Sequence, residues 1–252
     1  MAKSWTEHEL LIAMNLYCRL PFGQFDQSNK DICAVAEKMR RTPSSLSMKL
    51  CNLASLDNYH QSRGVVGLKG ASNLDKKIWN SFQENWSIMA EKSETAFDDL
   101  MSDVAPKGPE EESRTPEGPS ESERTVKVRR LQNFFRNTVL ANYENRCALT
   151  GISVPQLLIA SHIIPWSENE DRRADPTNGL CLNALHDRAF DRHLISFDEN
   201  YKLIVSSLLK KGHVSEFQGA NFAKLEGRPL TLPHRFAPDL QALEVHRNSF
   251  VP

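Results

Sequence analysis

The strongest pattern in the chain is LLIASHIIPWSENEDRRADPTNGLCLNALHDRAFDRH, residues 157–193. It opens on the apolar run LLIASHI, which is typical of a β-strand, and His162 stands at the end of that run. Asn178 follows 16 residues later, and His186 comes 8 residues after it, in a segment with helical periodicity. Taken singly, these are ordinary residues: a histidine at the edge of a core, an asparagine in a turn and a histidine on a helix.

Taken together, the three elements resemble the His-Asn-His (HNH) nuclease motif of the ββα-metal endonucleases. The closest branch has a signature that reads approximately A-H-I-x-P-W-S, N-G-L-x-L and H-x-x-F-D. Here the elements stand at residues 161–167, 178–182 and 186–191, and the resemblance covers about residues 140–206. Three ordered elements with their flanking Pro165 and Gly179 make the resemblance specific.

Cleavage of a phosphodiester requires a base that takes a proton from water and a cation that stabilises the charged phosphate. A histidine at a strand end can be neutral near pH 7, so His162 suits the role of general base. The resemblance implies that Asn178 holds the loop and orients His162. It also implies that His186 ligates one divalent ion, for which Mg²⁺, Mn²⁺ and Ni²⁺ are the candidates.

The chain departs from the wider HNH pattern at two places. Ser161 stands where many HNH proteins have an aspartate or histidine that serves as a second metal ligand. Asp191 is the nearest replacement, with Ser161 itself as the weaker alternative, although Asp191 could equally brace the helix through Arg188 or Arg192. Cys147 and Cys181 keep only one cysteine of each Cys-x-x-Cys pair that some relatives use for zinc, so we expect no structural zinc.

Arginine binds phosphate in a bidentate manner, and a nuclease must hold the strand that it cuts. Four arginines near the motif are therefore candidate DNA contacts: Arg172, Arg173, Arg188 and Arg192. The alternative for Arg172 and Arg173 is a solvated pair that is balanced by the neighbouring acidic residues.

Composition divides the chain into two domains. Residues 103–125, DVAPKGPEEESRTPEGPSESERT, are rich in proline, serine and acid and have no large apolar residue after Val104. Such a segment buries too little apolar surface to order itself, so it predicts a flexible acidic linker. We expect a helical domain at 1–102, a nuclease domain at 126–252, and α+β as the fold class.

The N-terminal part predicts three capped helices, with Thr6 and Glu9 as a capping box, Asn29 or Asp31 as the second cap, and Thr42-Pro43 at the third start. The stretch AVAEKMRRTPSSLSMKL, residues 34–50, resembles a helix-turn-helix with a recognition helix. Four polar residues are its candidate DNA contacts: Ser44, Ser45, Lys49 and Asn52. The alternative is an ordinary three-helix bundle with a solvated serine face.

The whole sequence excludes several classes of protein. Its 252 residues contain 40% apolar and 25% charged residues, without the roughly 18–20 successive apolar residues of a membrane span. The N-terminus lacks the apolar core of a signal peptide. Five scattered cysteines argue against a disulfide scaffold and for a reducing compartment, so we expect a cytoplasmic protein.

The sequence therefore predicts a metal-dependent HNH endonuclease that cuts DNA, similar in architecture to bacterial restriction or phage-defence enzymes. One alternative is a DNA-binding regulator with a degenerate nuclease fold. Another is a nuclease whose N-terminal domain binds a protein or a signalling ligand. Double-strand cleavage by one active site would require a homodimer, for which the sequence offers no clear interface.

Overall fold

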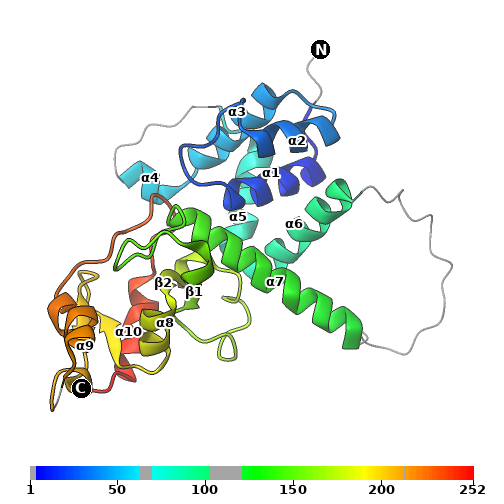
Figure 1. Ribbon diagram of the computed structural model, residues 1–252. Coiled ribbons are helices and arrows are strands. Elements are labelled where there is room, and N and C mark those ends of the chain that lie inside the picture. Colours follow the sequence, from blue (N-terminus) through cyan, green and yellow to red (C-terminus); the bar gives the residue numbers. More distant parts are fainter. Residues whose placement is uncertain (1–3, 63–69, 103–120, 213) are drawn as a thin grey trace.

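The computed structural model describes residues 4–62, 70–102, 121–212 and 214–252 (Figure 1). Its N-terminal part is helical, and its C-terminal part combines helices with two small sheets, so the fold is α+β as predicted. The first part contains α1 (Glu7–Arg19), α2 (Lys30–Lys38), α3 (Pro43–Ala54), α4 (Asn58–Ser62), α5 (Asn73–Glu84) and α6 (Trp86–Met101). No helix in the described ranges is both long enough and apolar enough to cross a bilayer.

The first three helices begin where their caps were predicted. Thr6 and Glu9 form a complete capping box at α1, and the Asn29 side chain accepts from the second and third amides of α2. Thr42 caps α3, and Pro43 occupies the first helical position, where no backbone donor is needed. Local chemistry therefore determines the starts of these helices.

A ββα unit forms the centre of the C-terminal part. Strands β1 (Leu158–His162) and β2 (Gly179–Asn183) pair antiparallel, with His162 opposite Gly179, and α8 (Ala184–Asp191) follows directly and packs on both strands. A second hairpin and two helices complete this part: β3 (Ile195–Phe197), β4 (Leu203–Val205), α9 (Glu216–Asn221) and α10 (Leu240–Asn248).

The long helix α7 (Glu121–Asn142) runs between the two parts of the molecule, in green in Figure 1. Leu131 and Phe134 belong to the hydrophobic core of the N-terminal helices, whereas Phe135 and Val139 belong to the core of the ββα unit. Gly179 lies so close to α7 that a Cβ there would stand 2.5 Å from Val139 Cγ2 and 2.9 Å from Phe135 Cζ. One helix thus contributes to both cores.

The predicted linker differs from the structure at its end. Residues 121–125 form the first turns of α7 rather than linker, and residues 103–120 lie outside the described ranges. The helix that contains the apolar face of α7 begins at Glu121, closer to the N-terminus than the composition of the segment suggests.

The C-terminal part also contacts the N-terminal core through Arg235 and Phe236. The Arg235 side chain is fully buried and donates to the backbone carbonyls of Tyr17, Cys18 and Leu20, which are left without helical partners at the end of α1. Phe236 packs against Tyr17 in that core. The two parts are therefore joined by direct packing as well as by the chain.

Candidate active site

An open cleft of about 470 Å³ lies between β1 and α8. The loop that follows β1 completes its wall. Its lining residues are Ile159, Ala160, Ser161, His162, Pro165, Trp166, Asp187, Arg188, Asp191 and Arg192. The cleft thus combines an imidazole, two carboxylates and two guanidinium groups.

His162 ends β1, and its ring contacts two aromatic side chains. The imidazole stacks on the Phe135 ring at 3.7 Å between centroids, and Trp166 meets it edge-on at 5.6 Å. Its Nε2 lies 3.0 Å from the carbonyl oxygen of Arg173. A carbonyl can only accept, so this bond requires the proton on Nε2 and leaves Nδ1 as the basic nitrogen. Burial lowers the pKa of His162 below its ordinary value of 6.5, which keeps the ring neutral at pH 7.

Asn178 holds the start of the loop that leaves His162. Its Oδ1 accepts from the amide of Ile164 at 2.8 Å, while its Nδ2 donates to the carbonyls of Ile164 at 3.1 Å and Arg172 at 3.3 Å. The side chain is almost fully buried. Asn178 therefore ties the start of the loop to Arg172, while its orienting role for His162 stays a prediction.

His186 lies away from the cleft. Its side chain is fully buried, with Nε2 2.8 Å from the carbonyl oxygen of Asn221 and Nδ1 3.1 Å from Oδ1 of Asn183. It stacks edge-on against Phe222, and it is absent from the lining of the cleft. The ring is buried, with Nε2 at hydrogen-bond distance from a backbone carbonyl, so the structure does not bring His186 together with His162 in the cleft.

We expect the variant His186→Ala to lose stability, because the Asn221 carbonyl loses its hydrogen-bond partner inside the protein. The loss is about 1–3 kcal/mol in the free energy of unfolding for an unsatisfied buried group. Urea unfolding measures it. Calorimetry should find unchanged affinity for Mn²⁺ under conditions where the variant is folded, and a folded variant that has lost Mn²⁺ affinity would restore His186 as a ligand.

Asp187 is the site residue that the sequence reading missed. On α8, positions 187 and 191 share one face and line the cleft, whereas positions 186 and 190 share the buried face. Burial raises the pKa of Asp187, and the negative charge of Asp191 raises it further. The spacing H-x-x-F-D, counted back from Phe190, also leads to position 187, so the signal was present in the sequence.

Ser161 lies on the floor of the cleft. Its hydroxyl is buried and makes no hydrogen bond of normal geometry, yet it lies close enough to Asp187 to lower the pKa of that carboxyl. A buried hydroxyl without a regular partner is costly, which points to a ligand that completes the site.

Two carboxylates in one cleft fit a hard divalent cation in kind, because Mg²⁺ commonly takes one or two carboxylates and completes its shell with water and phosphate oxygens. Within residues 4–62, 70–102, 121–212 and 214–252, no three His, Cys, Asp or Glu side chains converge as a metal cluster. The donor set therefore suits an ion that phosphate helps to hold, rather than a closed protein cage. Cys147 and Cys181 are both buried free thiols in the ββα core.

The four candidate arginines fall into two pairs. Arg188 and Arg192 are exposed and line the cleft. Arg172 instead forms ion pairs with Asp175 at 2.9 Å and Asp239 at 2.8 Å. Arg173 pairs with Glu170 at 3.1 Å and donates to the Trp166 carbonyl. Arg172 and Arg173 therefore stabilise the loop between β1 and β2, while Arg188 and Arg192 face the cleft.

Two of the predicted DNA contacts on α3 are wrong. Lys49 is buried, and its Nζ forms an ion pair with Asp75 at 2.8 Å, so it is not available to phosphate. Asn52 is also buried, with its side-chain amide beside Gly70. Ser44 is exposed and Ser45 is half-buried, which leaves these two as predictions.

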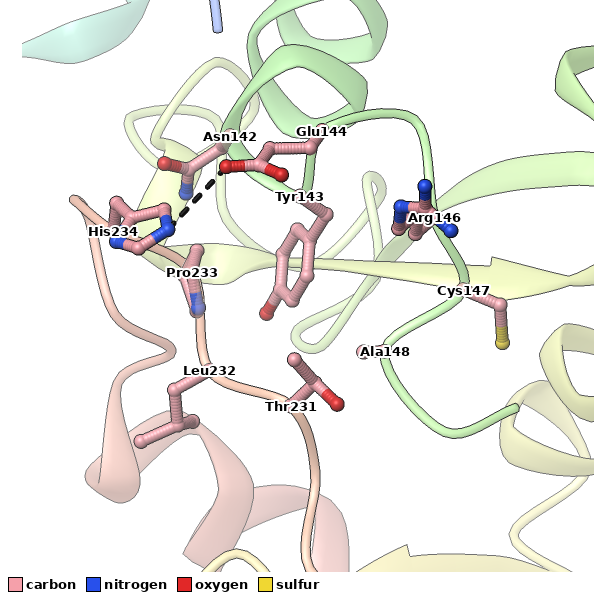
Figure 2. Close-up of a pocket in the computed structure, with 10 residues that line it drawn as sticks. All are labelled: Asn142, Tyr143, Glu144, Arg146, Cys147, Ala148, Thr231, Leu232, Pro233 and His234. Carbon is pink, nitrogen blue, oxygen red and sulfur yellow. Dashed lines mark ion pairs between the residues drawn. The ribbon is translucent and has the colours of Figure 1, made fainter. Parts of the chain in front are cut away.

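A second, smaller pocket lies at the end of α7, where the segment 231–234 passes the turn after the helix (Figure 2). Glu144 and His234 form an ion pair across it at 3.3 Å. The Tyr143 ring extends into the pocket, toward the segment that carries Thr231 and Pro233. None of the predicted catalytic residues lines it, so the cleft beside His162 is the candidate active site.

Comparison with known proteins gives one family. A family model described as HNH endonuclease matches residues 147–198, which include β1, the connecting loop, β2 and α8. None of the curated proteins matches the chain. HNH nucleases generally use a divalent metal, and nucleic acid is their substrate. The match coincides with the ββα unit and with the cleft, and residues 147–198 of this chain therefore form an HNH endonuclease domain.

Proposed function

We propose that this protein is a metal-dependent endonuclease that hydrolyses DNA phosphodiester bonds in the cleft between β1 and α8. The observation that carries the proposal is the hydrogen bond between His162 Nε2 and the Arg173 carbonyl, because it leaves Nδ1 as a neutral base beside two carboxylates and two exposed arginines.

In this mechanism, Nδ1 of His162 takes a proton from a water molecule as its oxygen attacks the phosphorus. The new P–O bond forms while the bond to the 3′ oxygen breaks. Asp187 and Asp191 would hold the divalent ion, with Ser161 as a further oxygen. When bound, the ion supplies charge neutralisation at the scissile phosphate and at the departing 3′ oxygen. Arg188 and Arg192 bind the flanking phosphates.

Plasmid cleavage tests the proposal. The purified protein is incubated with modified and unmodified plasmid DNA in Mg²⁺, Mn²⁺ or Ni²⁺, and in EDTA. We expect cleavage that requires a divalent ion. Loss of cleavage in all metals, or equal cleavage in EDTA, would contradict the proposal.

The biological setting that we propose is restriction or phage defence, in which one part of the chain recognises and the other cuts. Burial of Lys49 and Asn52 removes two of the contacts that favoured DNA recognition by α3. The alternative is that the N-terminal helices bind a protein or a signalling ligand. A gel-shift assay with duplex DNA on the full chain and on Ser44→Glu distinguishes the two, because only a DNA-reading α3 loses affinity in this variant.

Asp187→Asn should weaken divalent-ion binding about 100-fold, which is the upper end of the loss seen when the surroundings of a metal ligand are altered. Asp191→Asn should show the same defect, and raised Mn²⁺ should partly restore cleavage in each. The exposed Asp99 on α6 offers a matched control, Asp99→Asn. Calorimetry that gives wild-type Mn²⁺ affinity for both cleft variants would place the ion elsewhere.

The acid limb of the pH profile follows from the lowered pKa of His162. The reactive form of His162 is the neutral ring. We therefore expect kcat/KM to stay constant down to pH 6.5 and to fall only as the pH drops through the lowered pKa of His162. Initial cleavage rates between pH 4.5 and 8.5, on the order of half a unit apart, locate that limb. A limb centred above pH 6.5 would contradict the assignment of a buried neutral His162.

A further inference from the structure

The N-terminus of α6 contacts the middle of the loop that joins β1 to β2. Ser87 Oγ donates to the carbonyls of Glu170 at 2.7 Å and Asp171 at 3.0 Å. Asn85 Nδ2 donates to the Asp171 carboxylate at 3.0 Å, while its Oδ1 caps α6 by accepting from the amide of Ile88. A helix outside the HNH domain thus binds the backbone and one side chain of the loop that carries the predicted site.

The same loop sets the geometry of His162. The carbonyl that accepts from His162 Nε2 belongs to Arg173, two residues after Asp171. The Arg173 guanidinium lies over the Trp166 ring, 5.0 Å from its centroid, and Trp166 in turn meets the His162 ring. Ala174 is fully buried in the core of the N-terminal helices. Any shift of residues 170–174 therefore moves the acceptor that selects the tautomer of His162.

Other contacts hold the ends of this loop and its local turn, in which the Asn169 side chain accepts from the amides of Asp171 and Arg172 and Arg173 pairs with Glu170. Asn178 binds Ile164 at the start and Arg172 near the end, and Arg172 pairs with Asp175 and Asp239. Between these points, the bonds to residues 170 and 171 from elsewhere in the fold come from Asn85 and Ser87, as far as the described residues show. Helix α6 thus adds the contacts that tie the middle of the loop to a separate element of the fold.

We propose that Asn85 and Ser87 are positioning residues for the general base: they hold residues 170–171 so that the Arg173 carbonyl keeps the proton of His162 on Nε2. This proposal rests on the proposed nuclease function, and it assigns the N-terminal helices a part in catalysis besides recognition. A displacement of about 1 Å in a reacting group can cost on the order of 100-fold in rate, so weak surface hydrogen bonds can have large effects on cleavage.

The first test is Ser87→Ala in the full chain. We expect kcat for plasmid cleavage to fall about tenfold with KM little changed, because loss of positioning affects the bound complex rather than binding. Ser102→Ala is the matched control, since Ser102 lies at the other end of α6 and its hydroxyl also donates to a backbone carbonyl. Equal rates for the two variants, or a rise in KM alone, would overturn the proposal.

A second test asks whether Ser87 acts through His162. In a His162→Ala background, Ser87→Ala should cause no further loss of the residual cleavage. A full tenfold loss in that background would show a role independent of His162 and would overturn the proposal.

An exchange at the contact gives a rescue. Asn85→Asp keeps the cap acceptor but replaces the donor to Asp171 with a like charge, so it should lower kcat as Ser87→Ala does. Adding Asp171→Asn reverses the direction of the hydrogen bond and should restore the rate. Failure of the double variant to recover, with both variants folded, would contradict the proposal.

A readout without activity separates this proposal from the nuclease function. Nitrogen-15 NMR of histidine-labelled protein, with His162 assigned by its absence in His162→Ala, should show the Nε2–H tautomer in the wild type and a tautomer mixture in Ser87→Ala. An unchanged tautomer would overturn the positioning role. If the wild-type protein cuts no DNA, but Ser87→Ala still changes the tautomer of His162, the proposed nuclease function is overturned and the positioning role is not.

Discussion

His162→Ala should lower the rate of DNA cleavage by about 10²–10⁴-fold, the usual contribution of a general base. The reason lies in the hydrogen bond from Nε2 to the Arg173 carbonyl, which leaves Nδ1 free of its proton. Alanine supplies no base, so the attacking water keeps its proton. Affinity for DNA should remain, because the proposed phosphate contacts are Arg188 and Arg192, which also line the cleft. Single-turnover cleavage and a gel-shift assay measure the two effects separately.

Loss of the imidazole also removes its stacking on Phe135, and the design must exclude a packing effect. His162→Gln is the matched variant, because an amide nitrogen can donate to the Arg173 carbonyl but glutamine cannot act as a base at neutral pH. We expect His162→Gln to unfold near the wild-type temperature and to be as inactive as His162→Ala. Cleavage by either variant at near the wild-type rate would rule out His162 as the base.

The parts of the fold that follow from short-range chemistry could be predicted from sequence. Thr6, Asn29 and Thr42 cap their helices because a side-chain oxygen can satisfy the nearest orphan amides without help from the rest of the chain. His162 stands at a strand end for a similar reason, since the apolar run before it stops there. Asn178 opposes the loop start because antiparallel pairing brings the residue before Gly179 close to the one after His162.

The roles of residues on α8 depended on the phase of the helix, which the motif alone left open. A shift of one residue, from His186 to Asp187, turns a side chain from the core to the cleft, because successive residues are about 100° apart around the helix axis. Histidine is a common metal ligand, but His186 is buried, and its Nε2 lies at hydrogen-bond distance from the Asn221 carbonyl. The three-residue spacing to Phe190 is the sequence feature that distinguishes Asp187 from His186.

Long-range pairs could not be predicted at all. Lys49 is buried because Asp75, on another helix, neutralises it, and no local pattern links the two residues. Arg235 enters the N-terminal core from 215–218 residues away along the chain. Charged side chains such as these normally lie on the surface, and only the tertiary fold shows that these two are buried.

Removal of residues 1–102 should yield a protein that aggregates or fails to fold, rather than a weakly active nuclease. The deletion uncovers Leu131, Phe134 and Phe236, which pack in the N-terminal core. Each loses about 1.5–3 kcal/mol of burial free energy, against a total stability of about 5–15 kcal/mol for an ordinary domain. Arg235 also loses the carbonyls of α1 that accept its hydrogen bonds. Size-exclusion chromatography and circular dichroism of the truncated protein check the prediction.

Surface substitutions in the truncated protein allow its solubility and its catalytic activity to be measured separately. Polar substitutions at the uncovered positions, Leu131→Gln, Phe134→Glu and Phe236→Ser, should restore a soluble monomer, because they remove the apolar surface that drives association. This monomer should still cut DNA at least about tenfold more slowly than the full chain, since the loop at residues 170–171 has lost Asn85 and Ser87. An unmodified truncated protein that is monomeric and as active as the full chain would show that the two parts fold and act independently, because neither the shared core nor the contact with α6 would then be needed for cleavage.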